Sequence, residues 1–235
     1  MHGSKPFIAD FLNQLKKTSF KSDVAVFAPS IYIPCVSELL QSSAIHYGAQ
    51  NVSQFSSGAY TGEISISMLK EFGCRFSLVG HSERRELFGE GDDVVAAKFV
   101  AAIAHGVTPV LCVGETKTQH QAHETEKVIN EQLNAVIQTA GIDAFSHAVI
   151  AYEPVWAIGT GLTATPEQAQ AVHAFIRQQV RQLNPALAET VQILYGGSVK
   201  ASNAAALFAM PDIDGGLVGG ASLKVDEFMA ICQAI

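Results

Sequence analysis

The chain has 235 residues, of which 48% are hydrophobic and 16% are charged, and it carries a formal net charge of −7. This composition excludes a disordered or fibrous protein, and the length suits a single domain over residues 1–235. The scattered positive charges argue against a nucleic-acid partner, and no apolar run is long enough to predict a membrane span.

Short apolar runs of strand length alternate along the chain with longer segments of helical periodicity. Several of the runs are apolar without clean alternation, as expected of parallel strands that are covered on both faces. The predicted strands are Val24–Ala28, His46–Asn51, Phe76–Gly80, Thr108–Gly114, Ala148–Tyr152, Gln192–Tyr195 and Gly216–Gly219. The predicted helices include Phe7–Lys17, Ile33–Leu40, Val94–His105, Glu124–Gln138, Pro166–Leu183 and Val225–Ala234.

A first helix followed by seven strand–helix units predicts an α/β fold, namely a (β/α)8 TIM barrel whose first β-strand is missing from these residues. We therefore expect one barrel domain over residues 1–235 that is incomplete at its N-terminus. An open, doubly wound sheet is the alternative architecture. Such sheets usually have a nucleotide-binding fingerprint, and no Gly-x-Gly-x-x-Gly follows an early strand.

His81 and Glu83 directly follow the predicted strand 76–80. In such barrels the chemistry lies where strands end and the following loops begin. A solvated charged loop is the simpler interpretation, and it explains Arg85 and Glu86 well. The position of His81 between a buried strand and a polar helix start favours a functional side chain at the barrel mouth.

Glu153 follows the apolar strand 148–152 and precedes Pro154, a residue that fixes the direction of the chain as it leaves the strand. A surface glutamate is the simpler interpretation, but such residues rarely lie between a buried strand and a Pro-Val-Trp sequence. In these partly apolar surroundings the carboxylate is expected to have a raised pKa, which is what a base that removes a proton from carbon requires. Apolar Trp156 and the glycines up to Gly161 predict a lid over the site.

Glycine pairs end the last two predicted strands, as Gly196-Gly197-Ser198 and as Gly219-Gly220. Such pairs are often simple turns. Their recurrence on neighbouring strands favours a phosphate cradle, because backbone N–H groups of glycine approach an anion closely and the Ser198 hydroxyl adds a donor.

Other polar clusters give weaker signals. The spacing of His120 and His123 could form a surface metal site, but we favour a solvated helix start. His173 lies within a predicted helix, and it is interpreted as structural. The cysteines are far apart in apolar stretches typical of buried free thiols, and the N-terminus has no signal-peptide pattern, so we expect a cytoplasmic protein.

Seven motifs of the sequence resemble the triosephosphate isomerase family in order and spacing, over essentially the whole chain. They include the Gly-His-Ser-Glu-Arg-Arg motif and the run from Ala151 to Gly161 discussed above. The motifs lie at residues 48–51, 58–63, 80–85, 109–115, 151–161, 195–198 and 217–222.

The resemblance implies interconversion of dihydroxyacetone phosphate and glyceraldehyde 3-phosphate through an enediolate, with no cofactor and no metal. It implies that Glu153 moves the proton between the two carbons and that His81 polarises the carbonyl oxygens as a neutral imidazole, which are the known roles in this family. It also implies a homodimer through the loop from Val52 to Glu63. The remaining implied residues are Gly159, Ser198, Gly219 and Gly220 for the phosphate, Glu83 and Cys112 in support, and Glu115 near the lid.

The N-terminus departs from the family pattern. The family begins with an apolar strand that ends in Asn-x-Lys, whereas this sequence begins Met1-His2-Gly3-Ser4, and Lys5 lies too far along to replace the family lysine. We expect that an upstream strand exists in the natural protein. Two interpretations stay open: a working isomerase, or a catalytically impaired barrel fragment that only binds phosphate ligands or self-associates.

Overall fold

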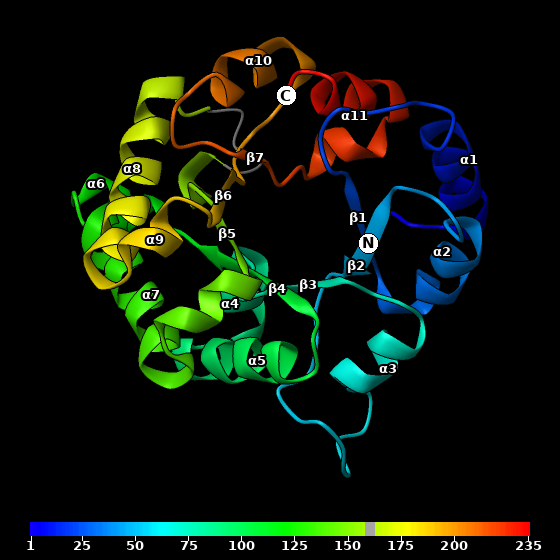
Figure 1. Cartoon of the computed structure of the whole chain (residues 1–235), viewed down its shortest axis with the longest axis horizontal. Helices are drawn as coiled ribbons and strands as arrows, with labels where there is room; N and C mark the ends of the chain where they lie inside the picture. The colour runs from blue at the N-terminus through cyan, green and yellow to red at the C-terminus, as the bar shows by residue number, and fades with distance from the viewer. Residues whose placement is uncertain (158–162) are drawn as a thin grey trace.

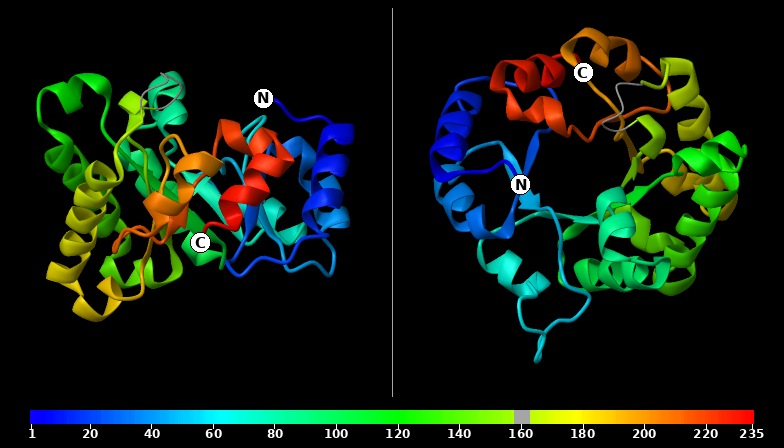
Figure 2. Two further views of the ribbon diagram at one scale, coloured as in Figure 1. Left: turned by 90° about the horizontal axis from the view of Figure 1, so that it is seen from above. Right: turned by 180° about the vertical axis from the view of Figure 1, so that it is seen from behind.

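Seven parallel strands form one curled sheet, and helices surround it (Figures 1 and 2). The computed structural model describes residues 1–157 and 163–235. Neighbours in the sheet follow one another in the chain, in the order β1 to β7. The strands are β1 (Ala25–Ala28), β2 (His46–Ala49), β3 (Phe76–Val79), β4 (Thr108–Val113), β5 (Val149–Tyr152), β6 (Gln192–Tyr195) and β7 (Gly215–Gly216).

Helices connect the strands on the outside of the sheet. The α-helices are α1 (Lys5–Leu15), α2 (Ile33–Leu39), α3 (Ile66–Glu71), α4 (Ser82–Phe88), α5 (Asp92–Ala104), α6 (Lys117–Gln121), α7 (Thr125–Ala140), α8 (Pro166–Leu183), α9 (Pro185–Ala188), α10 (Ala201–Phe208) and α11 (Val225–Cys232). Short 3-10 helices are η1 (Ser30–Tyr32), η2 (Ile142–His147), η3 (Val155–Ala157) and η4 (Gly220–Leu223).

The sequence prediction located each of these strands, and the largest error concerns the last one. The strand predicted at 216–219 is a two-residue strand, β7, one residue earlier. After Leu217 donates its N–H to the Tyr195 carbonyl oxygen at 2.9 Å, the chain turns away toward η4. Gly219 therefore lies in the loop after the end of the sheet, and Gly220 begins η4.

Helix α8 begins where local chemistry predicts. Thr165 caps it by accepting a hydrogen bond from the Gln168 backbone N–H, and the Gln168 side chain accepts from the Thr165 N–H in return. Pro166 occupies the first turn, where no N–H is needed. The apolar face of α8, with Ile176 and Val180, is buried.

The helices form a ring around the sheet, whereas the sheet itself is not closed within the described residues. Helix α11 packs against α1, and the rings of Phe11 and Phe228 lie 5.8 Å apart. The Ser22 hydroxyl donates to the Cys232 carbonyl oxygen at 3.1 Å. Within the described residues, however, no strand pairing joins β7 to β1. The α/β class and barrel-like strand order are confirmed, and an additional strand in this gap stays a prediction.

The core has two layers. The larger lies between the sheet and the helices, and a smaller cluster lies on the opposite face of the strands. Strand alternation explains this division, since Leu111 and Val113 of β4 face the helices while Val110 and Cys112 face the interior. The interior cluster consists of Leu78, Val110, Cys112, Val149 and Ala151.

Three of the four cysteines are buried free thiols, as predicted, and Cys35 is half-buried. None of the helices in the described part of the chain combines the length and apolar composition that crossing a bilayer requires.

His173 is buried on the sheet-facing side of α8, with 0% of its surface exposed. Its Nδ1 lies 3.1 Å from the Asp212 carbonyl oxygen, which can only accept, so Nδ1 carries a proton. Burial lowers the pKa of His173 to about 4, and the backbone hydrogen bond opposes this only in part. The structural interpretation of this histidine is confirmed.

This low pKa predicts that the protein loses stability in mild acid. Between about pH 6.5, where an unfolded histidine titrates, and about pH 4, the unfolded chain binds a proton that the folded chain does not. The free energy of unfolding should therefore fall by roughly 3 kcal/mol over this range. Urea unfolding at several pH values measures the slope, and His173→Gln should flatten it. An equal slope in both proteins would contradict the assignment.

Candidate active site

His81 and Glu153 meet at the carboxyl ends of their strands. They follow β3 and β5, which flank β4 in the sheet. Nε2 of His81 lies 2.9 Å from Oε1 of Glu153, and only 2% of Glu153 is exposed. Two groups singled out by their positions at strand ends thus form one pair, in which Glu153 is buried and His81 is half-buried.

Ser82 completes the contacts of the Glu153 carboxylate. Its backbone N–H donates to Oε2 at 2.9 Å, and its hydroxyl donates to Oε1 at 3.3 Å. Ser82 is not among the site residues that the sequence predicted. Its position directly after His81, at the first residue of α4, was the available signal, since N–H groups there have no partner within the helix.

The contacts of His81 define its tautomer. Its Nδ1 accepts a hydrogen bond from the Glu83 backbone N–H at 3.3 Å, so the proton of the neutral ring is on Nε2, facing Glu153. Burial lowers the pKa of His81, but the hydrogen bond and charge of Glu153 outweigh burial, with help from the Glu83 charge, and the pKa is raised. The raised value therefore depends on the present position of Glu153.

Two glycines allow the chain to pack closely around Glu153. A Cβ atom on Gly114 would lie 1.8 Å from the Glu153 carbonyl oxygen, and one on Gly196 would lie 2.9 Å from Glu153 Cγ. A side chain at Gly114 would displace Glu153. Gly196 thus has a packing role that the phosphate interpretation of its glycine pair did not include.

Cys112 and Arg85 support the interior of the site. Cys112 is fully buried on β4, and burial, together with the Glu153 charge, raises the pKa of its thiol well above the ordinary value. Arg85 donates to the Gly80 carbonyl oxygen at 2.7 Å and to that of Cys112 at 3.3 Å. The interpretation of Arg85 as a solvated loop residue is therefore wrong, because it ties β3 to β4.

Of the other predicted residues, Glu83, Ser198, Gly219 and Gly220 are more exposed than Glu153. Glu83 is exposed, with Oε2 4.0 Å from His81 Nδ1. Ser198 is half-buried after β6. Gly219 and Gly220 are exposed, and the space where their Cβ atoms would stand is open within 4 Å. Gly159 lies outside the described residues.

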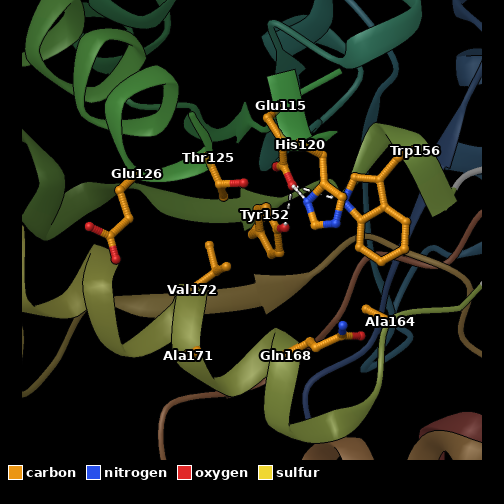
Figure 3. A pocket seen from close by; sticks show the side chains of 10 residues that line it. All are labelled: Glu115, His120, Thr125, Glu126, Tyr152, Trp156, Ala164, Gln168, Ala171 and Val172. Carbon is orange, nitrogen blue, oxygen red and sulfur yellow. Dashed lines mark hydrogen bonds and ion pairs between the residues drawn. The ribbon is translucent and has the colours of Figure 1, made fainter. Parts of the chain in front are cut away.

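Glu115 holds the segment that follows Glu153. Its side chain is fully buried, and Oε1 accepts hydrogen bonds from Trp156 Nε1 at 2.8 Å and from the Tyr152 hydroxyl at 3.2 Å. The Val155 N–H donates to its carbonyl oxygen at 3.2 Å. Beside these groups lies a cavity of about 150 Å³ (Figure 3). Its lining residues are Glu115, His120, Thr125, Glu126, Tyr152, Trp156, Ala164, Gln168, Ala171 and Val172.

Residues 1–235 match the family profile described as triosephosphate isomerase. A triosephosphate isomerase from Thiobacillus denitrificans is 56% identical over 234 residues, which cover 100% of this chain and 94% of that protein. The one from Pseudomonas entomophila is 55% identical over 237 residues, with the same coverage of both chains. The one from Nitrosomonas europaea is 60% identical over 209 residues, covering 89% of this chain and 83% of that protein.

Proposed function

Because the chain belongs to the triosephosphate isomerase family, we propose that it interconverts dihydroxyacetone phosphate and glyceraldehyde 3-phosphate. The contact between His81 and Glu153 carries this proposal, since it puts a carboxylate base beside a hydrogen-bond donor at the barrel mouth. No cofactor is required, because the net reaction moves protons and electron pairs within one substrate.

In the proposed reaction, the Glu153 carboxylate removes a proton from the carbon beside the carbonyl group. The electron pair of the broken C–H bond forms the C=C bond of an enediolate, and negative charge develops on the carbonyl oxygen. The Nε2–H of His81 donates to that oxygen and passes its proton to it, while the ring takes up the hydroxyl proton of the adjacent carbon, so the negative charge moves to the second oxygen. Glu153 then returns the first proton to the former carbonyl carbon. The C=C electron pair forms the new C–H bond, the second oxygen becomes the new carbonyl oxygen, and the carboxylate is restored. These roles are known for the family and are assigned to His81 and Glu153 by their motif positions.

Substrate binding must release Glu153 from its present contacts. The substrate carbonyl oxygen and the Glu153 carboxylate compete for the same Nε2–H of His81. When the carboxylate moves to the substrate carbon, its hydrogen bond no longer raises the pKa of His81, whereas burial still lowers it. The imidazole is then neutral, as an electrophile that donates one proton should be.

We assign phosphate binding to Gly159, Ser198, Gly219 and Gly220, with Glu83 and Cys112 supporting the site. The open space over Gly219 and Gly220 supports this assignment, because a phosphate oxygen can approach their backbone. A further support is that a Cβ atom on Gly196, two residues before Ser198, would lie 2.9 Å from Glu153 Cγ, so the segment after β6 passes close to Glu153.

A coupled enzyme assay on the 235-residue chain, with glyceraldehyde 3-phosphate as substrate, tests the activity. We expect turnover that His81→Gln lowers by about 10²- to 10³-fold, as loss of a donor to a developing oxyanion does. Turnover that is indistinguishable between the two proteins would refute the role of His81.

The second candidate is an impaired barrel that binds phosphate ligands with little turnover. The unpaired edges of β7 and β1 in the described residues favour it. A chain extended upstream by an apolar strand ending in Asn-x-Lys should then be about 10²- to 10³-fold more active, because it gains a fixed positive donor. Equal activity of the two chains would exclude this candidate.

We also propose a homodimer through the loop from Val52 to Glu63. This loop projects from the body of the molecule (Figure 1). The aromatic rings of Phe55 and Tyr60 stack with their centroids 3.8 Å apart, and 38% and 43% of the surfaces of these two residues are exposed. Exposed stacked aromatics are typical of association surfaces. Sedimentation velocity should give a dimer that Tyr60→Asp weakens, and a monomer in the unsubstituted protein would refute the proposal.

A further inference from the structure

His120 lies against the segment that follows Glu153 in the chain. Its ring stacks on the Trp156 indole, with the centroids 4.3 Å apart and 20° between the planes. Its Nδ1 lies 3.2 Å from Glu115 Oε1, the oxygen that also accepts from Trp156 Nε1. His120 thus contacts both partners of the hydrogen bond that holds Trp156, as Figure 3 shows. The interpretation of His120 as a solvated helix residue missed these contacts.

The chain between Glu153 and Trp156 has little freedom. Pro154 fixes one backbone torsion, and its carbonyl oxygen accepts from the Ala157 N–H at 2.8 Å. Val155 is bound through its N–H to the carbonyl oxygen of Glu115. A displacement of the Trp156 side chain is therefore transmitted over three residues to the backbone of the base.

We propose that His120 is a positioning residue for the isomerase reaction. It stacks on Trp156 and binds Glu115, and so it holds residues 154–157 in the arrangement from which Glu153 reaches the substrate. His120 itself touches no reacting atom. This inference rests on the proposed function for its kinetic consequence, whereas its spectroscopic consequence rests on the geometry alone.

The Glu115 carboxylate contacts both rings. Its Oε1 accepts from Trp156 Nε1 at 2.8 Å and lies 3.2 Å from His120 Nδ1, so one buried oxygen holds the two side chains. The His120 ring adds to this by covering one face of the Trp156 indole.

Tryptophan emission reports this contact directly, because Trp156 is the one tryptophan of the chain. The stacked imidazole covers one face of the indole, so His120→Ala should expose that face to water and shift the emission maximum to longer wavelength. His120→Phe keeps a ring on the indole and should retain the position of the maximum. His123→Asn is the matched control, since His123 is exposed and its positive φ of 57° suits asparagine, and it should leave the emission unchanged.

Steady-state kinetics test the positioning role. His120→Ala should lower kcat on the order of tenfold with little change in KM, less than the hundredfold that a 1 Å misplacement can cause. His120→Phe keeps a ring on Trp156 and should recover part of the loss. Unchanged kcat and unchanged emission in His120→Ala would overturn the proposal. So would equal losses of kcat and thermal stability in both variants, because that pattern indicates structural damage alone. An inactive unsubstituted chain would count against the proposed function, and the emission of the three variants would still decide the placement of His120.

Discussion

Replacement of Glu153 by glutamine should lower kcat by about 10²- to 10⁴-fold, the usual contribution of a positioned general base. The amide cannot take a proton from carbon, while its size and its contact with Ser82 are nearly preserved. Glu153→Asp keeps a carboxylate but shortens its reach, so its loss of kcat should be smaller. The measurement is kcat in the coupled assay, alongside the inhibition constant of inorganic phosphate, which should stay within about twofold because the phosphate loops are unchanged.

The control for this experiment is Glu131→Gln, a substitution of an exposed carboxylate on α7. It should leave both constants unchanged. If Glu153→Gln turns over at the rate of the unsubstituted protein, Glu153 is not the base. If it loses phosphate binding in parallel with kcat, the variant has lost the structure of the site, and the assigned division between base and phosphate loops is wrong.

Local sequence patterns predicted the groups that meet at the strand ends. His81 and Glu153 could be identified because each follows a buried apolar run, and the end of a parallel strand determines where the next side chain lies. The long helix α8 was predicted with correct bounds because its cap and its apolar periodicity agree. The prediction of β7 was the least accurate, since a run of glycines carries no apolar alternation.

Contacts between residues far apart in sequence could not be predicted in this way. Ser82 and Glu153 are 71 positions apart, and no local pattern links them. The same holds for His120, whose stacking on Trp156 depends on how α6 packs beside η3. The segment with Asp212 and Asp214 leads into the last strand, and no local pattern in it indicates the ionic role of its two carboxylates.

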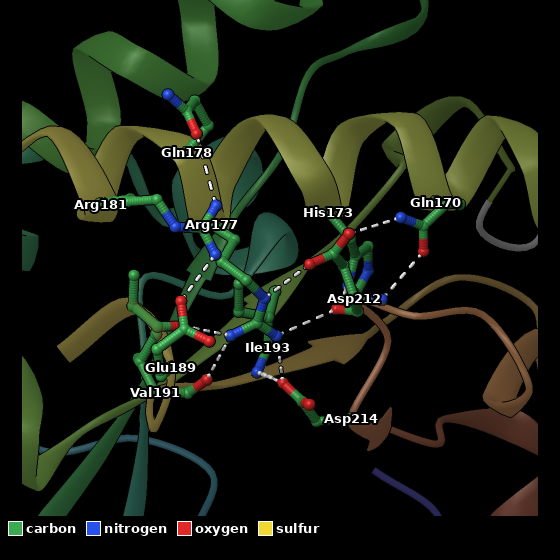
Figure 4. Close-up of polar contacts among 11 residues, drawn as sticks. Gln170, His173, Arg177, Gln178, Arg181, Glu189, Val191, Ile193, Asp212 and Asp214 are labelled. Carbon is green, nitrogen blue, oxygen red and sulfur yellow. Dashed lines mark hydrogen bonds and ion pairs between the residues drawn. The ribbon is translucent and has the colours of Figure 1, made fainter. Parts of the chain in front are cut away.

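That ionic role belongs to Arg177, a buried residue of α8 (Figure 4). Its guanidinium donates to Asp212 at 2.7 Å and to Asp214 at 2.7 Å, and also to the carbonyl oxygens of Ala188 and Val191 at 2.8 and 3.0 Å. Asp214 additionally accepts from a backbone N–H of β6 at 2.7 Å. One arginine thus ties α8 to the segment that places β7 beside β6.

Arg177→Met should therefore destabilise the protein by about 3 kcal/mol, because it removes the cation that pairs with two carboxylates and the donor that the Ala188 and Val191 carbonyl oxygens share. We take the lower end of the range for buried pairs because Asp212 and Asp214 are partly exposed. Urea unfolding measures the change. The control is Arg181→Met, one helical turn later, where the ion pair with Glu189 is exposed and the expected loss is below about 1 kcal/mol.

The same variants separate stability from catalysis. None of the hydrogen bonds described for Arg177 joins it to His81 or Glu153. At a temperature where both proteins are folded, kcat per folded molecule of Arg177→Met should therefore be within about threefold of the unsubstituted value. Gly219 and Gly220 follow β7, and a loosened β7 should instead raise KM. A loss of stability equal to that of Arg181→Met would show that the buried cluster does not hold the end of the sheet in place.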